Sequence, residues 1–162
     1  MITNDNLKSR MVEKIIDLLK SLYSYGFSKP IVSQDDWSTS IIFKLTNIAL
    51  EIELDWRDFN VFVLVVRMER GNLPSGYYVS AGKPCRYHLQ KVISDRRWNV
   101  DQEAFAELTP KKNSRRQKIL WSEDMMFDRF LAYKIVLDDC VDKLRKEESM
   151  IFEVAPDNGT LE

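Results

Sequence analysis

Apolar residues recur at three- and four-residue spacing near the start of the chain. Within residues 4–25 the apolar stripe consists of Leu7, Met11, Ile15, Leu18, Leu19 and Leu22. Charged residues occupy the other faces, so the spacing predicts an amphipathic helix. Asn4 or Asp5 is suited to cap its start, and Gly26 is suited to the left-handed conformation that ends many helices.

The middle of the chain alternates with a period of two. Three runs at 39–45, 48–56 and 61–69 are rich in β-branched or aromatic residues and are separated by the turn formers "TN" and "DFN". This pattern predicts an antiparallel meander. In the second run, the residues expected to face the core are Ile48, Leu50, Ile52, Leu54 and Trp56. The residues expected on the solvated face are Ala49, Glu51, Glu53, Asp55 and Arg57. The third run is apolar on both faces, so we expect both to be covered.

Beyond residue 76 the pattern predicts shorter elements and then a long helix. We expect a short strand at 77–79, a helix near 86–95 and another short helix within 99–108. The final helix should begin after Ser122 and run for about 25 residues, to judge from the length of its stripe. That stripe consists of Met126, Phe127, Phe130, Leu131, Lys134, Leu137, Val141 and Leu144.

Together these elements predict an α+β fold. An N-terminal helix, an antiparallel β-meander, short helices and a long C-terminal helix follow one another, and the two long helices should cover the apolar face of the sheet. We expect one domain over residues 1–150 and a frayed tail over residues 151–162.

Composition narrows the functional classes. The 162 residues include 30% charged side chains but carry a net charge of only −1, whereas a general nucleic-acid binder usually has a basic excess. The N-terminus has no apolar stretch after a basic segment, and the longest apolar run, "VFVLVV", has the length of a strand. We therefore expect a cytoplasmic protein with Cys85 and Cys140 as reduced thiols. No cofactor-binding motif is present in the sequence, and we expect no cofactor.

The acidic residues of the second run permit three interpretations. Glu51, Glu53 and Asp55 should lie on one strand face, about 7 Å apart in succession, where oxygen ligands could hold a divalent metal. Such sites usually need a further acidic group and often a lysine, whereas Arg57 is placed here to pair with Asp55. The face could instead be merely solvated, or it could dock a partner. Strand alternation accounts for the acidic pattern, so we expect no metal.

Cys85 and His88 form a Cys-x-x-His motif. A structural zinc site needs four ligands, and even with Cys140 as a third the sequence offers no obvious fourth. A nucleophilic Cys–His pair is conceivable, although such pairs usually meet through the fold. We expect Cys85 and His88 to be partly buried and Cys140 to lie in the core.

A basic run and a group of tyrosines remain. The basic run consists of Lys111, Lys112, Arg115, Arg116 and Lys118 and is followed by Trp121. It could contact phosphates and stack a base, or it could be a solvated loop, which the charge balance favours. Tyr77 and Tyr78 are of the type enriched at protein interfaces.

The order of the first elements resembles that of known proteins. A helix ending at "YGF", followed by "IIFKLTNIALEIELDWRDFNVFVLVV", resembles the pattern of several small immunity proteins of bacterial toxin–immunity systems, over about residues 15–70. The resemblance implies stoichiometric capture of a cognate toxin domain in the cytoplasm of the producing cell. These families share no catalytic motif.

This resemblance suggests a mechanism of electrostatic and steric blocking. If the toxin is a nuclease, the face carrying Glu51, Glu53 and Asp55 would pair with its basic groove. Trp56 or a loop tyrosine would anchor the interface. Two alternatives stay open: a regulatory or nucleic-acid-contacting domain that uses residues 111–118, and a metal-dependent hydrolase that uses the acidic strand face.

Overall fold

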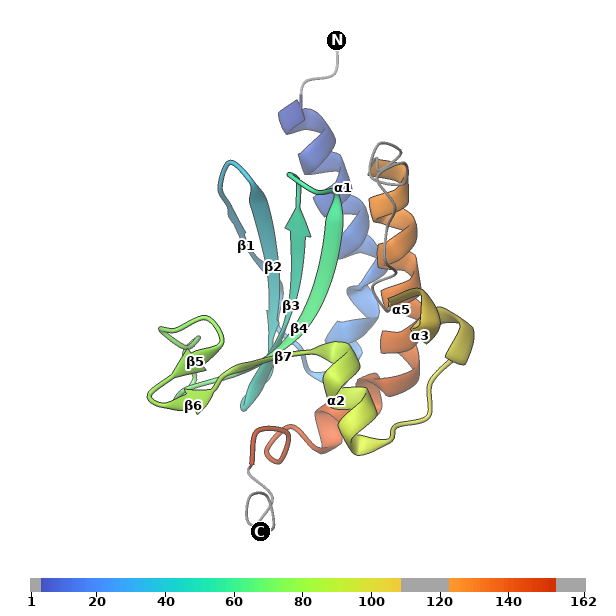
Figure 1. Ribbon diagram of the computed structural model, residues 1–162. Coiled ribbons are helices and arrows are strands. Elements are labelled where there is room, and N and C mark those ends of the chain that lie inside the picture. The colour runs from blue at the N-terminus through green and yellow to red at the C-terminus, as the bar shows by residue number, and fades with distance from the viewer. Residues whose placement is uncertain (1–3, 109–122, 154–162) are drawn as a thin grey trace.

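One antiparallel sheet lies against a layer of helices in the computed structural model, which describes residues 4–108 and 123–153 (Figure 1). The helices are α1 (Asn4–Leu18), the 3₁₀ helix η1 (Lys20–Tyr25), α2 (Leu89–Arg96), α3 (Gln102–Leu108) and α5 (Glu123–Lys146). The strands are β1 (Ile31–Gln34), β2 (Ser38–Lys44), β3 (Ile48–Asp55), β4 (Asn60–Arg67), β5 (Val79–Ser80), β6 (Lys83–Pro84) and β7 (Arg86–His88). The predicted α+β class is confirmed.

The central sheet has five strands in the order β1-β2-β3-β4-β7. The predicted meander corresponds to β2, β3 and β4, which pair antiparallel in sequence order, with Ile52 opposite both Ile41 and Val63. The edge strand β1 was not predicted, because its sequence "IVSQ" is too short to show a period. At the other edge, β7 pairs with β4 after an excursion of the chain over residues 69–84.

The predicted N-terminal helix changes its winding before it ends. Its α-helical part stops at Leu18, and a 3₁₀ helix follows until Gly26, which adopts the expected left-handed conformation with φ 96°. Leu19, Leu22 and Tyr25 are spaced by three residues, and this spacing keeps them on one face of a 3₁₀ helix. The tighter winding therefore keeps the apolar contact with the sheet.

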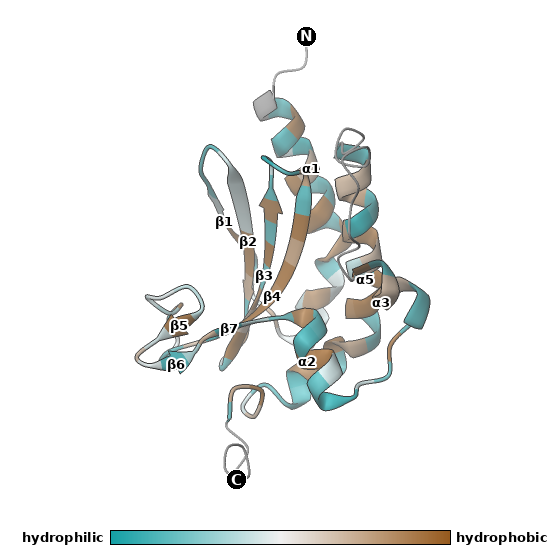
Figure 2. Cartoon of the chain, in the orientation of Figure 1, coloured by the Kyte–Doolittle hydropathy of each residue, from teal (hydrophilic) through white to brown (hydrophobic). Residues whose placement is uncertain are grey.

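The main core lies between the sheet and the helices. Figure 2 shows the strands largely coloured as hydrophobic, facing the mixed surfaces of α1 and α5. Ile41, Ile52 and Val63 point from the sheet into this core and are completely buried. From the helix layer, Ile15 and Phe130 meet them in the same cluster. The expectation that both long helices cover one face of the sheet is confirmed.

The C-terminal helix is close to its predicted length and stripe. α5 has 24 residues, and its stripe residues Met126, Phe130, Leu137, Val141 and Leu144 are buried. Packing continues past the expected boundary at residue 150: Ile151 is buried, and the ring of Phe152 stacks on Tyr87. In the described part of the chain, no helix is long and apolar enough to cross a membrane.

Candidate functional site

The excursion over residues 69–84 covers part of the outer face of the sheet, the face turned away from the helices. Leu73 of the excursion packs on a second, small apolar cluster, which consists of Ile42, Ala49, Val66 and Met68. Arg67 fastens the excursion by donating from Nε to the Pro84 carbonyl at 3.0 Å and from its terminal nitrogen to the Ser80 carbonyl at 3.1 Å. Both faces of β4 are thereby covered, as its apolar sequence predicted.

Glu51 is buried on this outer face and forms an ion pair. Its carboxylate accepts a hydrogen bond from Nε of Arg86 at 2.8 Å, and the side chains of the two residues are only 4% and 9% exposed. The same guanidinium donates to the carbonyls of Gly76 and Tyr77 at 3.1 and 2.8 Å. A buried carboxylate needs such a partner, because desolvation of an unpaired charge is very unfavourable. The expectation that Glu51 faces water is therefore wrong.

Glu53 is half-buried and lies beside the excursion. Its carboxylate accepts a hydrogen bond from the Tyr77 hydroxyl. Burial and this bond to an anion raise the pKa of the Tyr77 phenol above its ordinary value. The ring of Tyr77 lies 4.4 Å from the Arg86 guanidinium, measured to the ring centroid. The expected row of free carboxylates is thus a network in which charges and aromatic rings hold one another in place.

A row of rings extends from this network across the outer face. Tyr77 and Tyr78 meet edge to face with centroids 4.6 Å apart, and Tyr78 continues to His88 at 6.3 Å. His88 in turn contacts Phe62 of β4 with centroids 5.8 Å apart. Tyr77, Tyr78 and Val79 are exposed, and we call these three residues the tyrosine patch. The structure thus brings the predicted residues Tyr77 and Tyr78 next to the predicted residue Glu53.

The other predicted residues of β3 lie at its end and serve the turn that follows. Asp55 accepts hydrogen bonds from the backbone N–H groups of Arg57 and Asp58, at 3.0 and 3.2 Å. The Arg57 guanidinium lies 5.7 Å from the ring centroid of Trp37. Trp56 is buried, and its indole N–H donates to the Thr39 hydroxyl at 2.8 Å. Trp56 is therefore a core residue, as its place on the inward face of the strand predicted, and its expected role as an interface anchor stays a prediction.

The cysteines and the histidine do not come together as a catalytic or zinc site. The Cys85 thiol is buried and donates to the Tyr77 carbonyl at 2.9 Å, while His88 faces Tyr78 and Phe62. Cys140 lies in the core on α5, as expected, and burial raises the pKa of its thiol to about 12. Within residues 4–108 and 123–153, no three His, Cys, Asp or Glu side chains are grouped to hold a metal ion.

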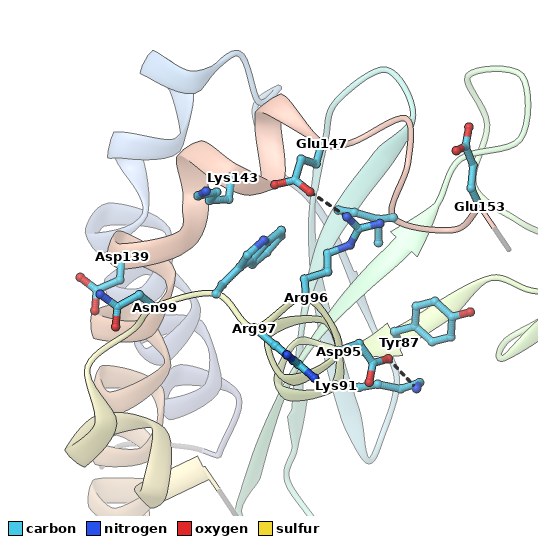
Figure 3. A pocket seen from close by; sticks show the side chains of 12 residues that line it. Tyr87, Lys91, Asp95, Arg96, Arg97, Asn99, Asp139, Lys143, Glu147 and Glu153 are labelled. Carbon is cyan, nitrogen blue, oxygen red and sulfur yellow. Dashed lines mark hydrogen bonds and ion pairs between the residues drawn. The ribbon is translucent and has the colours of Figure 1, made fainter. Parts of the chain in front are cut away.

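A wide cleft lies elsewhere, between α2 and the end of α5, with a volume of about 1010 Å³ (Figure 3). Figure 3 shows Arg96 paired with Glu147 and Lys91 paired with Asp95 along its walls. Arg96 donates to Glu147 at 2.7 Å, and Lys91 donates to Asp95 at 2.8 Å. With these charges engaged inside the protein, we assign no ligand to this cleft.

The predicted nucleic-acid residues Lys111, Lys112, Arg115, Arg116 and Lys118 lie outside the described residues. Sequence reasoning also missed several residues that the structure brings to the surface site. Arg86 and Phe62 reach the acidic strand only through strand pairing with β4 and β3, which no local pattern reveals. Trp37 could have been found from the sequence: it is an aromatic residue directly after "DD", in the three-residue connection between β1 and β2.

The resemblance to immunity proteins concerns the order of elements over residues 15–70, and it includes neither the excursion nor the tyrosine patch. It is independent of the contacts described above and stays a prediction. Comparison with protein-family models, with curated proteins and with solved structures gives no match to this chain.

Proposed function

We propose that this chain is a non-catalytic module that binds another protein through the tyrosine patch and the outer face beside it. The carrying observation is that Tyr77, Tyr78 and Val79 are exposed although their backbone is held tightly. Tyrosines are enriched at protein interfaces because one side chain offers both a large apolar area and a hydroxyl. Side chains held in place before binding also lose less conformational entropy when a partner arrives.

The attachments of the patch support this proposal. Arg86 contacts the Tyr77 carbonyl and ring, and the Cys85 backbone N–H donates to the Tyr78 carbonyl at 2.8 Å. The backbone of the patch is thereby joined to β7, which is part of the central sheet. A contact surface on a rigid element keeps its geometry, and this geometry favours specific recognition.

The finer proposal is that the partner is a toxin domain and the chain its immunity protein. The resemblance over residues 15–70 supports it, and so does Glu53, a carboxylate at the border of the patch. A nuclease toxin with a basic substrate groove would be attracted to this border and blocked by the tyrosines. The complex would be stoichiometric and non-covalent.

The contacts do not favour the metal-dependent hydrolase. Glu51 pairs with Arg86, Glu53 accepts from Tyr77, and Asp55 accepts from two turn amides. A metal on this face would have to displace all three sets of partners. The nucleic-acid alternative depends on residues 111–118 and is separated from our proposal by the experiment below.

Site-specific photo-crosslinking in the native host tests the proposed function. A benzophenone amino acid replaces Tyr78 in one variant and Ile135 in a control. Both side chains are about half exposed, at 50% and 48%, but Ile135 lies on the helix layer. We expect one discrete protein adduct of 1:1 stoichiometry from position 78 and none from position 135. No adduct from position 78, together with salt-sensitive binding of mixed DNA or RNA by the purified chain, would contradict the proposal.

A further inference from the structure

A second, smaller pocket opens at the end of the sheet where the β1–β2 and β3–β4 turns meet the first turns of α1 and α5. Figure 1 shows these four segments gathered at the same end of the molecule. The pocket has a volume of about 230 Å³. Its lining, which we call the tryptophan pocket, consists of Leu7, Lys8, Asp36, Trp37, Trp56, Phe59 and Glu123.

Trp37 is the most exposed large apolar side chain of the described residues, at 63%, yet its backbone is fixed. Its N–H and that of Ser38 each donate to the Asp35 carboxylate at 2.8 Å. These two bonds hold the pKa of the Asp35 carboxyl below its ordinary value. The Trp37 carbonyl accepts a hydrogen bond from the backbone N–H of Trp56 at 2.9 Å. The fold therefore holds an indole at the surface, where the core gains little from it.

Phe59 completes the aromatic wall with a strained backbone. Its φ is 51°, in the left-handed region that bulky residues rarely adopt. This conformation is unfavourable for a side chain with a Cβ and persists only where the surroundings impose it. It brings the half-buried ring of Phe59 to the same pocket as Trp37 and Trp56.

The indoles of this end already attract cations of the chain itself. Nζ of Lys8 lies 5.8 Å from the ring centroid of Trp56, and the Arg57 guanidinium lies 5.7 Å from that of Trp37. Lys8 also makes a long hydrogen bond of 3.4 Å to the Asp36 carbonyl. The aromatic faces thus present negative potential to positive groups, and Lys8 is held in the pocket only weakly.

Within residues 4–108 and 123–153, acidic groups outnumber basic ones around the pocket. The β1–β2 turn carries Asp35 and Asp36, and the β3–β4 turn carries Asp58. Among the residues that the structure describes, Asp36 and Glu123 line the pocket itself, against Lys8 as the one cation in its lining. The carboxylates repel an anionic ligand and do not attract a neutral one. A cation is attracted by both the ring faces and the carboxylates.

We propose that the tryptophan pocket receives an arginine side chain of the partner protein, an inference that rests on the proposed protein-binding function. A guanidinium is planar, so it stacks on an indole and pairs with a carboxylate at the same time, and it is more weakly hydrated than an ammonium. The arginine replaces Lys8 over Trp56, and Lys8 turns out to solvent. This end of the sheet thus adds an acidic contact with a basic partner to the one that Glu53 offers at the border of the tyrosine patch, while Glu51 is paired inside the fold.

The test uses a blocked peptide, acetyl-Gly-Gly-Arg-Gly-Gly-amide, titrated into the full chain and followed by the indole N–H signals in ¹H–¹⁵N spectra. The control peptide has citrulline, which has the shape of arginine without its charge. We expect saturable shifts of the Trp37 indole in the millimolar range and about fivefold weaker binding of the citrulline peptide. Equal binding of the two peptides would overturn the proposal.

Two variants test whether Lys8 competes with the arginine of the peptide and whether Trp37 is needed for binding. Lys8→Met removes the resident cation, so the arginine peptide should bind about threefold more tightly. Trp37→Ala should abolish binding while its unfolding midpoint stays near that of the unchanged chain, because the indole is exposed. Weaker binding by Lys8→Met would overturn the proposal, since it would show that Lys8 supports the bound peptide and does not compete with its arginine. Tyr78→Ala should bind the peptide as the unchanged chain does. A failure of the arginine proposal would therefore not contradict the proposed role of the tyrosine patch.

Discussion

At the scale of the residue, the burial of Glu51 determines which carboxylates of β3 are available to a partner. Glu51 and Glu53 alternate on the same face of β3, yet Glu51 is buried against Arg86 and Glu53 borders the exposed tyrosine patch. The difference arises from β7 and the excursion, which cover one end of the face and leave the other end partly open. An exchange of Glu51 for lysine would therefore disrupt the fold rather than report on a partner.

The Glu51–Arg86 pair gives the first prediction. Arg86→Met leaves a buried carboxylate without its cation, which should lower the free energy of unfolding by about 3–5 kcal/mol. The double variant Glu51→Leu with Arg86→Met should recover much of this loss, because the unpaired charge is gone. Urea denaturation of the three proteins measures both steps. A loss below about 1 kcal/mol for Arg86→Met would show that the pair is solvated.

At the scale of the element, the meander was predictable and the excursion was not. β2, β3 and β4 are each rich in β-branched or aromatic residues and bounded by turn formers, so local sequence identifies them, and the alternation of β3 identifies the face that packs on the helices. The excursion owes its position to Arg67, Arg86 and Cys85, which act across the sheet and leave no periodic signal. The sequence predicts Tyr77 and Tyr78 as interface residues from their type, but the hydrogen bond of Tyr77 to Glu53 depends on the position of the excursion and leaves no local signal.

Gly76 gives the second prediction, because it is the hinge of the tyrosine patch. A Cβ at this position would lie 1.8 Å from the Val79 carbonyl oxygen, so Gly76→Ala must move the turn that carries Tyr77 and Tyr78. Partner binding should fall as far as in Tyr78→Ala, while the far-ultraviolet circular dichroism stays unchanged. Gly71→Asn is the control, because Gly71 is in open space and asparagine tolerates its φ of +80°. Normal binding by Gly76→Ala would contradict the role of this turn.

Strand order gives the third prediction. β3 lies between two paired neighbours and is largely buried, whereas β1 is an edge strand with all four residues exposed. Native-state hydrogen exchange should therefore find the slowest amides in β3 and β4 and much faster ones in β1. Protection of β1 equal to that of β3 in the free protein would indicate that another strand covers this edge.

At the scale of the whole molecule, three acidic groups whose pKa is raised by the fold make stability sensitive to alkali. Burial raises the pKa of Cys140 to about 12, and it raises the pKa of Tyr77 and of Tyr133 above the ordinary value. In the unfolded chain these groups lose their protons near their ordinary pKa, about 8.5 for cysteine and about 10 for tyrosine. The folded state then binds more protons than the unfolded state, so stability falls as pH rises.

The fourth prediction follows from this sign. The contribution of these three groups to the free energy of unfolding should be constant below about pH 8. It should decrease between about pH 8.5 and pH 11. Cys140→Ala should reduce the slope that begins near the cysteine pKa, and Tyr77→Phe should reduce it above the tyrosine pKa. Urea titrations at a series of pH values measure these slopes. Unchanged slopes in both variants would show that the fold raises the pKa of neither group.

The central claim also concerns the whole molecule: a rigid tyrosine patch on the outer face binds a partner protein. The most direct measurement is the dissociation constant of the purified chain with the partner identified by crosslinking, compared for Tyr78→Ala and Ile135→Ala. Both changes remove a half-exposed side chain, one from the patch and one from the helix layer. We predict that Tyr78→Ala weakens binding by about tenfold or more, as expected of an interface anchor, and that Ile135→Ala leaves it unchanged. Equal dissociation constants for the two variants would contradict the claim.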